Sequence, residues 1–198
     1  MGASIAMIEV DQATGYLKEM YETVKTPHGT VDNVMRVHSL RPRTMEGHVV
    51  LYRSVLHSPD NTLPLFFLEI IASYTSIINQ CTYSLTHHFA NVRKLLRNDP
   101  RADAIYEAFV SGHPEKQFDG KELAILRYTR KLTEAVGKMA SADVEALRAA
   151  GCDDGEILEV NQVCAYFNYS NRLLNGLGVT TEGDVIGYYA DPAEEQRE

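Results

Sequence analysis

The stretch from Glu69 to His88 reads EIIASYTSIINQCTYSLTHH, and the rest of the chain is best interpreted around it. It begins with a long apolar pattern typical of a helix, continues through a short polar break, and ends in a second helical pattern. Glu69 lies in the most apolar run of the protein, Cys81 follows twelve residues later, and His88 comes seven residues after that. A buried acid, a thiol at a helix start and an imidazole two turns on are the groups of a proton-relay or thiol site.

Composition limits the class of protein. The chain has 198 residues, of which 44% are hydrophobic, enough for one ordinary core. Its net charge of −8 comes without any basic block, so we expect no nucleic-acid partner. There is no run of 18 apolar residues and no secretory pattern at the start, so we expect a cytoplasmic protein with no membrane contact. Three widely spaced cysteines predict neither a disulfide framework nor a zinc site.

Apolar residues recur at helical spacing along the whole chain, and no long stretch alternates with a period of two. The sequence therefore predicts an all-α, single-domain bundle (1–198) of roughly eight or nine helices. Its motif core is 63–97 and its C-terminal helices fall within 119–178. The expected helices are 11–25, 32–40, 43–57, 63–79, 81–97, one starting near Pro100, 119–136, 141–151 and 153–177. We expect an extended arm at 1–9 and a frayed acidic tail after Asp191.

The helix through Glu69 carries a narrow polar stripe on an otherwise apolar rod. The stripe consists of Glu69, Ser73, Ser76 and Gln80. Polar side chains on a buried helix need polar partners. Glu69 is therefore either a proton carrier whose pKa is raised by burial or a structural carboxylate paired with an arginine such as Arg172.

The following helix places three reactive groups on one face. Cys81 falls in its first turn, where free amides and the helix dipole favour a thiolate. Ser84 and His88 share its face, whereas His87 points elsewhere. The alternative is that Cys81 is a small core residue and His88 a satisfied core histidine. Adjacent histidines diverge around a helix, so we expect no metal site here.

The last long helix offers a second polar cluster. Its members, Asn168, Asn171, Arg172 and Asn175, recur at helical spacing. They form either a pocket wall, including a charge partner for Glu69, or a hydrogen-bond network or subunit contact. Tyr83 and Tyr166 are candidates for lining a substrate pocket, although tyrosines in helices are often amphipathic core residues.

These residues resemble a known motif. Glu, eleven residues, Cys, two residues, Cys, three residues and His is the motif of the alkylhydroperoxidase D family, within the carboxymuconolactone decarboxylase-like superfamily. The chain matches it at Glu69, Cys81 and His88. Segments 57–81 and 146–179 also resemble the peroxidase-related proteins of that family. The resemblance covers most of the chain and implies the helical fold of the family.

The chain departs from the motif at one position, because Ser84 stands where the family has its second cysteine. In the family, the two thiols cycle between dithiol and disulfide while the Glu and His relay activates one of them. A serine cannot form that disulfide, but it can donate a hydrogen bond to a thiolate or sulfenate at Cys81. Cys152 and Cys164 are too distant in the sequence to be assigned as its partners.

The resemblance implies three hypotheses. The first is a peroxidase-related oxidoreductase with an antioxidant role, which reduces a peroxide or similar small electrophile through Cys81. Glu69 would relay protons, His88 would act on the thiol, Ser84 would bond the sulfur, and an external thiol would regenerate the protein. The second is a decarboxylase-like lyase in which Glu69 and His88 perform acid–base chemistry. The third is an inactive binding or assembly module. The family further implies a small-molecule substrate, no cofactor, and a homo-oligomer (dimer, trimer or hexamer).

Overall fold

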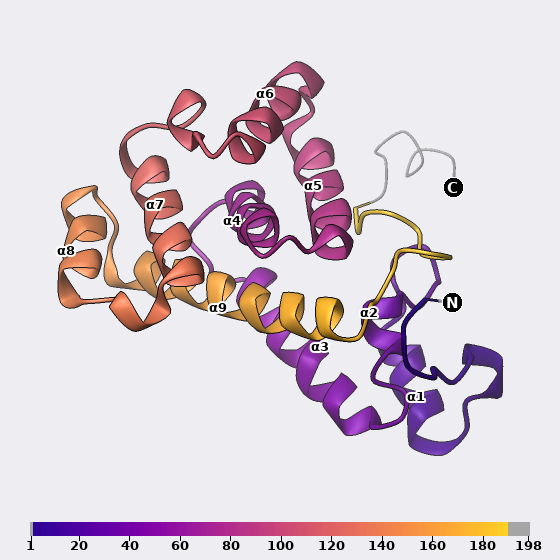
Figure 1. Ribbon diagram of the computed structural model, residues 1–198. Helices are drawn as coiled ribbons and strands as arrows, with labels where there is room; N and C mark the ends of the chain where they lie inside the picture. The colour runs from indigo at the N-terminus through magenta and orange to yellow at the C-terminus, as the bar shows by residue number, and fades with distance from the viewer. Residues whose placement is uncertain (1, 190–198) are drawn as a thin grey trace.

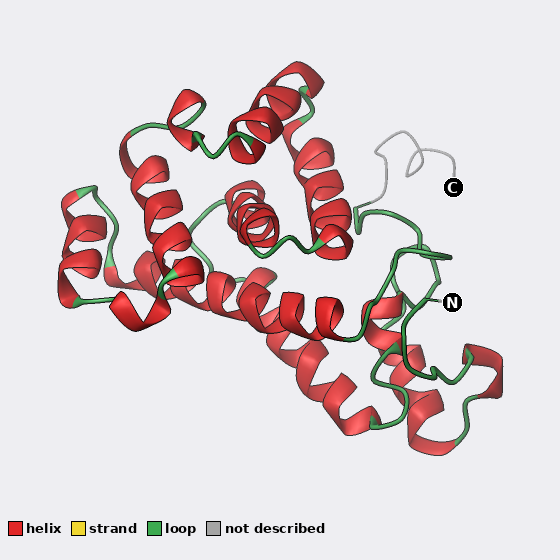
Figure 2. Ribbon diagram, viewed as in Figure 1, coloured by secondary structure: helices red, strands yellow, loops and turns green. Residues whose placement is uncertain are grey.

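The computed structural model describes residues 2–189, and this part of the chain contains helices, turns and loops but no strand (Figures 1 and 2). The predicted all-α fold is confirmed, with nine α-helices and three short 3-10 helices in the described residues. The α-helices are α1 (Gly15–Thr23), α2 (Asn33–Arg36), α3 (Pro42–Leu56), α4 (Leu65–Ile78), α5 (Thr82–Leu96), α6 (Asp99–Val110), α7 (Gly120–Glu134), α8 (Ser141–Ala149) and α9 (Asp154–Gly176). The 3-10 helices are η1 (Val10–Gln12), η2 (Pro114–Lys116) and η3 (Val136–Lys138). The tail after Asp191 lies outside the described residues.

Two of the predicted helices are shorter than expected. Asp11 was predicted to start the first helix, but it lies in a 3-10 turn and α1 begins at Gly15. Gly15 has φ +53°, a left-handed conformation that interrupts a right-handed helix and that glycine adopts without strain. The second helix was predicted to reach Leu40, but α2 ends at Arg36 and the chain continues through turns to α3.

Helix α4 is the centre of the larger core. It contacts α5, α7 and α9, and Figure 1 shows it surrounded by these helices. Ten consecutive residues of α4, from Phe67 to Ser76, are buried. A helix that is apolar nearly all round has this position because each of its faces must be removed from water. In the described residues, no helix is both long and apolar enough to cross a membrane.

A tight turn joins α4 to α5 and makes the two helices a hairpin. Gln80 has φ +53°, and the backbone amide of Cys81 donates to the carbonyl of Ser76 at 2.9 Å. Helices commonly end with a residue in the left-handed conformation, and Gln80 ends α4 in this way. The hairpin lays α5 along α4, so that side chains of the two helices meet.

The two ends of the described chain lie side by side. The Ser4 amide donates to the carbonyl of Leu177, and the Thr180 amide donates to the carbonyl of Gly2, both at 2.8 Å. Residues 2–9 contain no helix, as expected for an extended arm. Beyond α9, residues 177–189 run past α2 and α5 and reach the edge of the pocket described below.

Candidate functional site

Glu69 and His88 are in direct contact in the α4–α5 hairpin. His88 Nδ1 lies 2.7 Å from Glu69 Oε2. The Glu69 side chain is 0% exposed and the His88 side chain is 14% exposed. The other carboxyl oxygen of Glu69 accepts from Asn91 Nδ2 at 3.1 Å and from the Tyr189 hydroxyl at 3.3 Å. Because Nδ1–H donates to the carboxyl, Nε2 is the nitrogen of His88 that remains for chemistry.

This geometry excludes one of the partners considered for Glu69. The predicted structural pair with Arg172 is wrong. The Arg172 guanidinium instead donates to the backbone and side-chain oxygens of Asn168, at 2.7 Å each. Glu69 has histidine, amide and phenol donors in place of a fixed cation. Such a carboxyl can orient His88 and stabilise its protonated form.

His88 and Ser84 open onto a pocket of about 90 Å³. A volume of this size holds several water molecules or a small organic molecule. The wall is formed by α2, α3, α5, α9, the segment between α1 and α2, and the chain near residue 188. Its polar members are Lys25, Thr26, Asp32, Tyr52, Arg53, Tyr83, Ser84, His87, His88, Asn91, Tyr166, Ser170 and Tyr188. The predicted positions of Tyr83 and Tyr166 in a pocket wall are confirmed.

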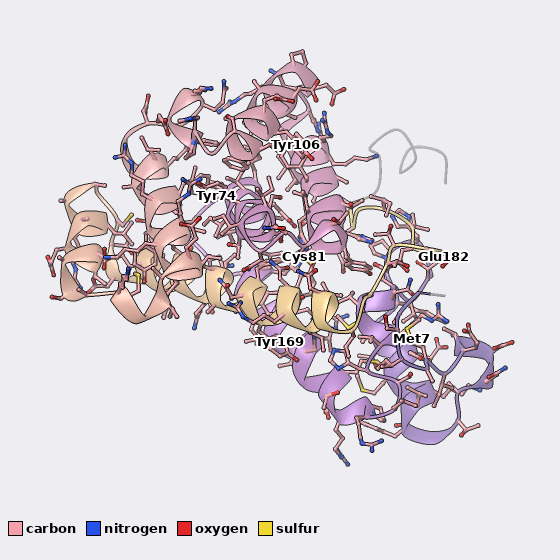
Figure 3. All side chains as sticks on the ribbon, in the orientation of Figure 1. Met7, Tyr74, Cys81, Tyr106, Tyr169 and Glu182 are labelled. Atoms are coloured by element: carbon pink, nitrogen blue, oxygen red, sulfur yellow. The ribbon has the colours of Figure 1, made fainter. Side chains whose placement is uncertain are left out.

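Cys81 is not part of this wall. It is 1% exposed and packs in an apolar cluster with Val37, Leu174 and Val179. Figure 3 shows it where the α4–α5 turn meets the end of α9. Cys81 was predicted to lie in the first turn of α5, but it is instead the N-cap residue that precedes this helix. The structure therefore separates the thiol from the face that opens onto the pocket.

The protonation of Cys81 also differs from the expectation. Burial raises the pKa of the Cys81 thiol above its ordinary value, and the backbone amides of Ser84 and Tyr83 offset only part of this rise. Sequence reasoning counted the helix start, which favours the thiolate, but not the apolar cluster, which disfavours it. The cost of removing a thiolate from water is the larger effect here.

Ser84 belongs to a buried hydroxyl and amide network. Its hydroxyl and that of Ser76 are hydrogen-bonded at 2.9 Å, and Asn171 contacts Ser76 from α9. Nearby, Asn79 Nδ2 donates to Asn168 Oδ1 at 3.1 Å. The polar cluster of the last helix is therefore mainly a hydrogen-bond network, one of the two predicted alternatives. It fixes the end of α9 against the hairpin that carries the site.

The other two cysteines have separate environments. Cys164 is buried on α9, where its sulfur contacts Thr75, Thr133 and Asn168. Cys152 is also buried, and burial raises the pKa of both thiols. All three cysteines are free thiols. None of the polar contacts to Cys164 involves Cys81.

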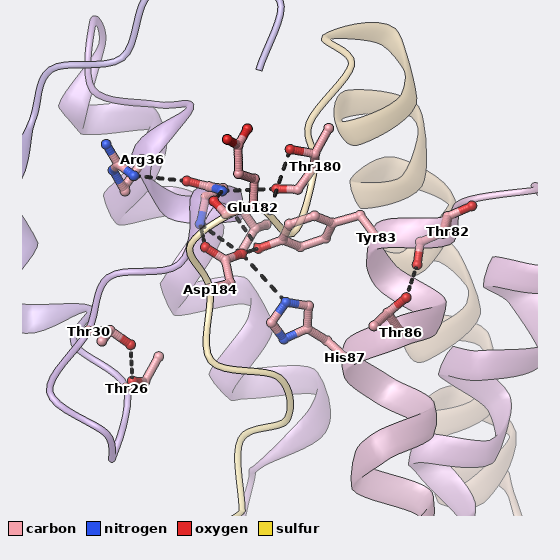
Figure 4. A network of polar contacts seen from close by, with 12 residues as sticks. Thr26, Thr30, Arg36, Thr82, Tyr83, Thr86, His87, Thr180, Glu182 and Asp184 are labelled. Atoms are coloured by element: carbon pink, nitrogen blue, oxygen red, sulfur yellow. Dashed lines mark hydrogen bonds and ion pairs between the residues drawn. The ribbon is translucent and has the colours of Figure 1, made fainter. Parts of the chain in front are cut away.

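A second charged cluster flanks the pocket and is centred on Asp184 (Figure 4). The Asp184 carboxylate accepts from the Tyr83 hydroxyl and from the Asn33 amide, and His87 Nε2 lies 3.5 Å from it. His87 was expected on a different face of α5 from Ser84 and His88, but all three side chains line the same pocket. Asp32 lies beside this cluster, and burial together with the charge of Asp184 raises the pKa of Asp32 to about 6. The pocket therefore has a carboxyl on one side that takes up a proton more readily than an ordinary aspartate.

Sequence reasoning missed several residues of the site. Asn91 follows His88 by one turn of α5, so the spacing could have revealed it. Tyr52, Tyr188 and Tyr189 come from distant segments, and no local pattern marks them. Burial and the charge of Glu69 raise the pKa of Tyr52 and of Tyr189, so both phenols remain protonated donors.

Solved structures with this arrangement of helices identify the fold. The core of an alkylhydroperoxidase, a peroxidase-related protein from Ralstonia eutropha JMP134, has a TM-score of 0.80 and 23% identity over 93% of this chain and 94% of that chain. The chain has the alkylhydroperoxidase D-like fold. A second peroxidase-related protein with this fold, from Silicibacter sp. TM1040, has a TM-score of 0.77 and 22% identity over 96% of this chain and 95% of that one.

The alkylhydroperoxidase D-like fold also occurs in the debrominase Bmp8. That structure has a TM-score of 0.72 and 13% identity, and covers 92% of each chain. A scan of protein-family models and a search of curated proteins find no match to the sequence. The similarity to these solved structures confirms the fold expected from the motif, and the activity has to be argued from the site itself.

Proposed function

We propose that the protein is an acid–base enzyme of the lyase or isomerase type, in which His88 transfers a proton to and from a small organic acid. The observation that carries this proposal is the Glu69–His88 pair at the edge of the pocket, together with the burial of Cys81 outside it. Among the hypotheses from the sequence, acid–base chemistry is the one whose proton-transferring group, His88, lines this pocket.

In the resting site, His88 is set to act as a base. Its Nδ1–H donates to Glu69, and no described residue bonds Nε2, which leaves a lone pair available at the pocket. We infer that Nε2 takes a proton from a carbon next to a carbonyl group of the substrate. The C–H bond breaks, the proton goes to Nε2, and the electron pair moves to the carbonyl oxygen as an enolate. In an isomerisation, the enolate re-forms the carbonyl as His88 returns the proton to a different carbon of the conjugated system. In a decarboxylation, the C–C bond to a carboxylate breaks in place of the C–H bond, CO₂ leaves, and the resulting enolate takes a proton from the His88 imidazolium, which Glu69 stabilises.

The charges at the pocket support a carboxylate substrate. Lys25 and Arg53 both line the pocket. Asp32 also lines the pocket, and its pKa is raised to about 6, so it repels an anion less once it is protonated below that pH. Basic side chains around a small pocket favour anionic ligands. The small volume of the pocket limits the substrate to a compact molecule.

The experiment uses carboxymuconolactone as the probe, with ¹H NMR in D₂O to detect conversion and the entry of deuterium at carbon. We expect the wild type and Cys81→Ser to catalyse conversion of carboxymuconolactone, deuterium entry at carbon, or both. In His88→Gln the rate should fall by about 10²-fold or more. No reaction of the wild type would overturn the proposal. Activity that survives His88→Gln but is lost in Cys81→Ser would replace it with a thiol mechanism.

A thiol reaction at Cys81 is the second candidate, favoured by the two backbone amides of Ser84 and Tyr83 near the sulfur. In this reaction the thiolate attacks a peroxide oxygen, the O–O bond breaks, an alcohol leaves and a sulfenate forms. An external dithiol would then reduce the sulfenate, releasing water and becoming a disulfide. Trapping of a sulfenate at Cys81 after treatment with cumene hydroperoxide would support this candidate.

A further inference from the structure

A continuous chain of hydrogen bonds runs from the surface of the protein to the wall of the pocket. Its members, from the outside inward, are Thr44, His38, His48 and Tyr166. His38 Nδ1 lies 2.8 Å from Thr44 Oγ1, and His38 Nε2 lies 3.0 Å from His48 Nδ1. His48 Nε2 lies 2.8 Å from the Tyr166 hydroxyl. Thr44 is exposed, both histidines are buried, and Tyr166 lines the pocket.

The direction of each hydrogen bond follows from its outer end. Thr44 donates its single hydroxyl proton to the carbonyl of Arg41 at 2.8 Å, and a carbonyl can only accept. Thr44 must therefore accept from His38 Nδ1–H. Burial lowers the pKa of His38, so the ring is neutral and its Nε2 accepts from His48 Nδ1–H.

The same reasoning continues to the pocket. Burial and the neighbouring His38 lower the pKa of His48 to about 3, so this ring is neutral too. Its Nε2 accepts from the hydroxyl of Tyr166. Burial raises the pKa of Tyr166, which therefore keeps its proton. Both imidazoles are thus Nδ1–H tautomers, and every N–H and O–H along the chain points toward the surface.

We propose that this chain is a proton path that connects the pocket with bulk solvent. In one passage Tyr166 takes a proton from the pocket and releases its own proton to His48 Nε2. His48 passes its Nδ1 proton to His38 Nε2, and His38 passes its Nδ1 proton to Thr44 Oγ1, which releases its own hydroxyl proton to solvent. No charge remains in the interior, which matters because burial disfavours both the phenolate and the imidazolium. Both rings end as Nε2–H tautomers, and a passage in the opposite direction restores them.

The role of the path in catalysis rests on the proposed function. A substrate that loses a proton at the pocket and later regains one would use the outward and inward passages in turn. Water in the pocket can bridge Tyr166 and His88, since both line it. His38 and His48 act through Tyr166 and are therefore positioning residues. The path explains why two histidines are kept buried and neutral in a row, which a purely apolar core would not require.

The first test needs no substrate. In ¹⁵N NMR spectra at pH 7, we expect His38 and His48 to be neutral Nδ1–H tautomers. We expect the exchange of the His48 Nδ1 proton with water to slow by about tenfold or more in Thr44→Val and His38→Gln, because general proton relays contribute factors of this size or larger. His113→Gln, which changes an exposed histidine away from the path, is the matched control. An Nε2–H tautomer of either ring, or unchanged exchange in Thr44→Val, would overturn the proposal.

The second test uses the deuterium assay with carboxymuconolactone. If the path serves catalysis, Thr44→Val should lower the entry of solvent deuterium into product while leaving KM unchanged, because Thr44 is not part of the pocket wall. Thr44→Val is the more conservative of the two variants, since it removes one exposed hydroxyl. If the wild type is active and Thr44→Val takes up deuterium as fast as the wild type, the proton path is wrong and the proposed function stands. If the wild type is inactive, but both rings are Nδ1–H tautomers and proton exchange slows in Thr44→Val, the proposed function is wrong and the proton path stands.

Discussion

His88 Nδ1 lies 2.7 Å from Oε2 of Glu69, a carboxyl that is 0% exposed, and this contact joins the two helices of the central hairpin. Because the contact fixes the proton on Nδ1, it determines which nitrogen of His88 faces the pocket. The same carboxyl is held by Asn91 and Tyr189, so its orientation is defined from three sides. The pair is the feature of this molecule on which the proposed chemistry depends most directly.

Glu69→Gln should replace the charged acceptor of His88 Nδ1–H by a neutral amide with little change in volume. We expect turnover of carboxymuconolactone to fall by about 10²-fold or more, with a smaller change in KM, because the base loses its orientation and its imidazolium loses a countercharge. The ¹⁵N shifts of His88 should show a changed tautomer or mixed tautomers. Ser73→Ala is a control on the same helix, since its buried hydroxyl has no hydrogen-bond partner in the described residues. Equal activity of Glu69→Gln and wild type would contradict this role.

Cys81 should react slowly with iodoacetamide in the native protein at pH 7. Burial limits access and raises the pKa of the thiol, so little thiolate is present. Mass spectrometry after timed alkylation measures the rate, with Cys81→Ala to identify the signal. Cys81→Ser should lower the free energy of unfolding by about 1–3 kcal/mol, because it places a hydroxyl in an apolar cluster. Rapid labelling of Cys81 would argue for the thiol mechanism.

His48 should make the protein sensitive to acid. Burial and His38 lower the pKa of His48 to about 3 in the folded protein, below the ordinary value of 6.5. Between these values the unfolded chain binds a proton that the folded protein does not, so stability falls as the pH drops from about 6.5 toward 3. At about pH 4.5 the loss from this residue should reach roughly 2–3 kcal/mol. Urea unfolding at several pH values measures it, and His48→Gln should flatten the profile in this range.

Asp32 should have the opposite dependence on pH. Its folded pKa is raised to about 6, above its ordinary value of 3.8, because burial and Asp184 disfavour the charge. The folded protein therefore carries a penalty above pH 6 that is relieved as the pH falls toward 4. Asp32→Asn should raise the unfolding free energy by about 1–2 kcal/mol at pH 7.5, after allowance for solvent screening, and by little near pH 4. A stabilisation that is independent of pH would show that the charge is not the cause.

Asn33 should hold the C-terminal segment against the pocket. Its Nδ2 donates to the carbonyls of Thr180 and Glu182 at 2.9 Å, and the residue is fully buried. Asn33→Ala should lower the unfolding free energy by about 2–4 kcal/mol, since it leaves buried acceptors without a donor. Hydrogen exchange should become faster in residues 180–189. Asn175→Ala is the control, because its single side-chain bond to the Asn79 carbonyl is exposed and should matter little.

Local pattern was sufficient to predict most of the helices and to place Glu69 and His88 on neighbouring helices, but it left open whether Glu69 pairs with His88 or with Arg172. Apolar spacing defines each helix within a few residues, and a two-residue break before Cys81 predicts a hairpin whose faces must meet. The resemblance of Glu69, Cys81 and His88 to a family motif also implied the fold, which the solved structures confirm. These features depend on residues that are close in the sequence, so the sequence alone determined them.

Only the tertiary structure decided which of these groups face the pocket. Cys81 and Ser84 are three residues apart, yet one lies among apolar side chains from the N-terminal arm and α9 while the other lines the pocket. Their environments come from segments far away along the chain, including Ala3 and Leu174 beside Cys81, and no local pattern reports such contacts. The same holds for the path through His38 and His48, because its inner end is Tyr166 on α9. Burial and hydrogen bonding depend on packing between distant elements, and that packing determines which groups can react.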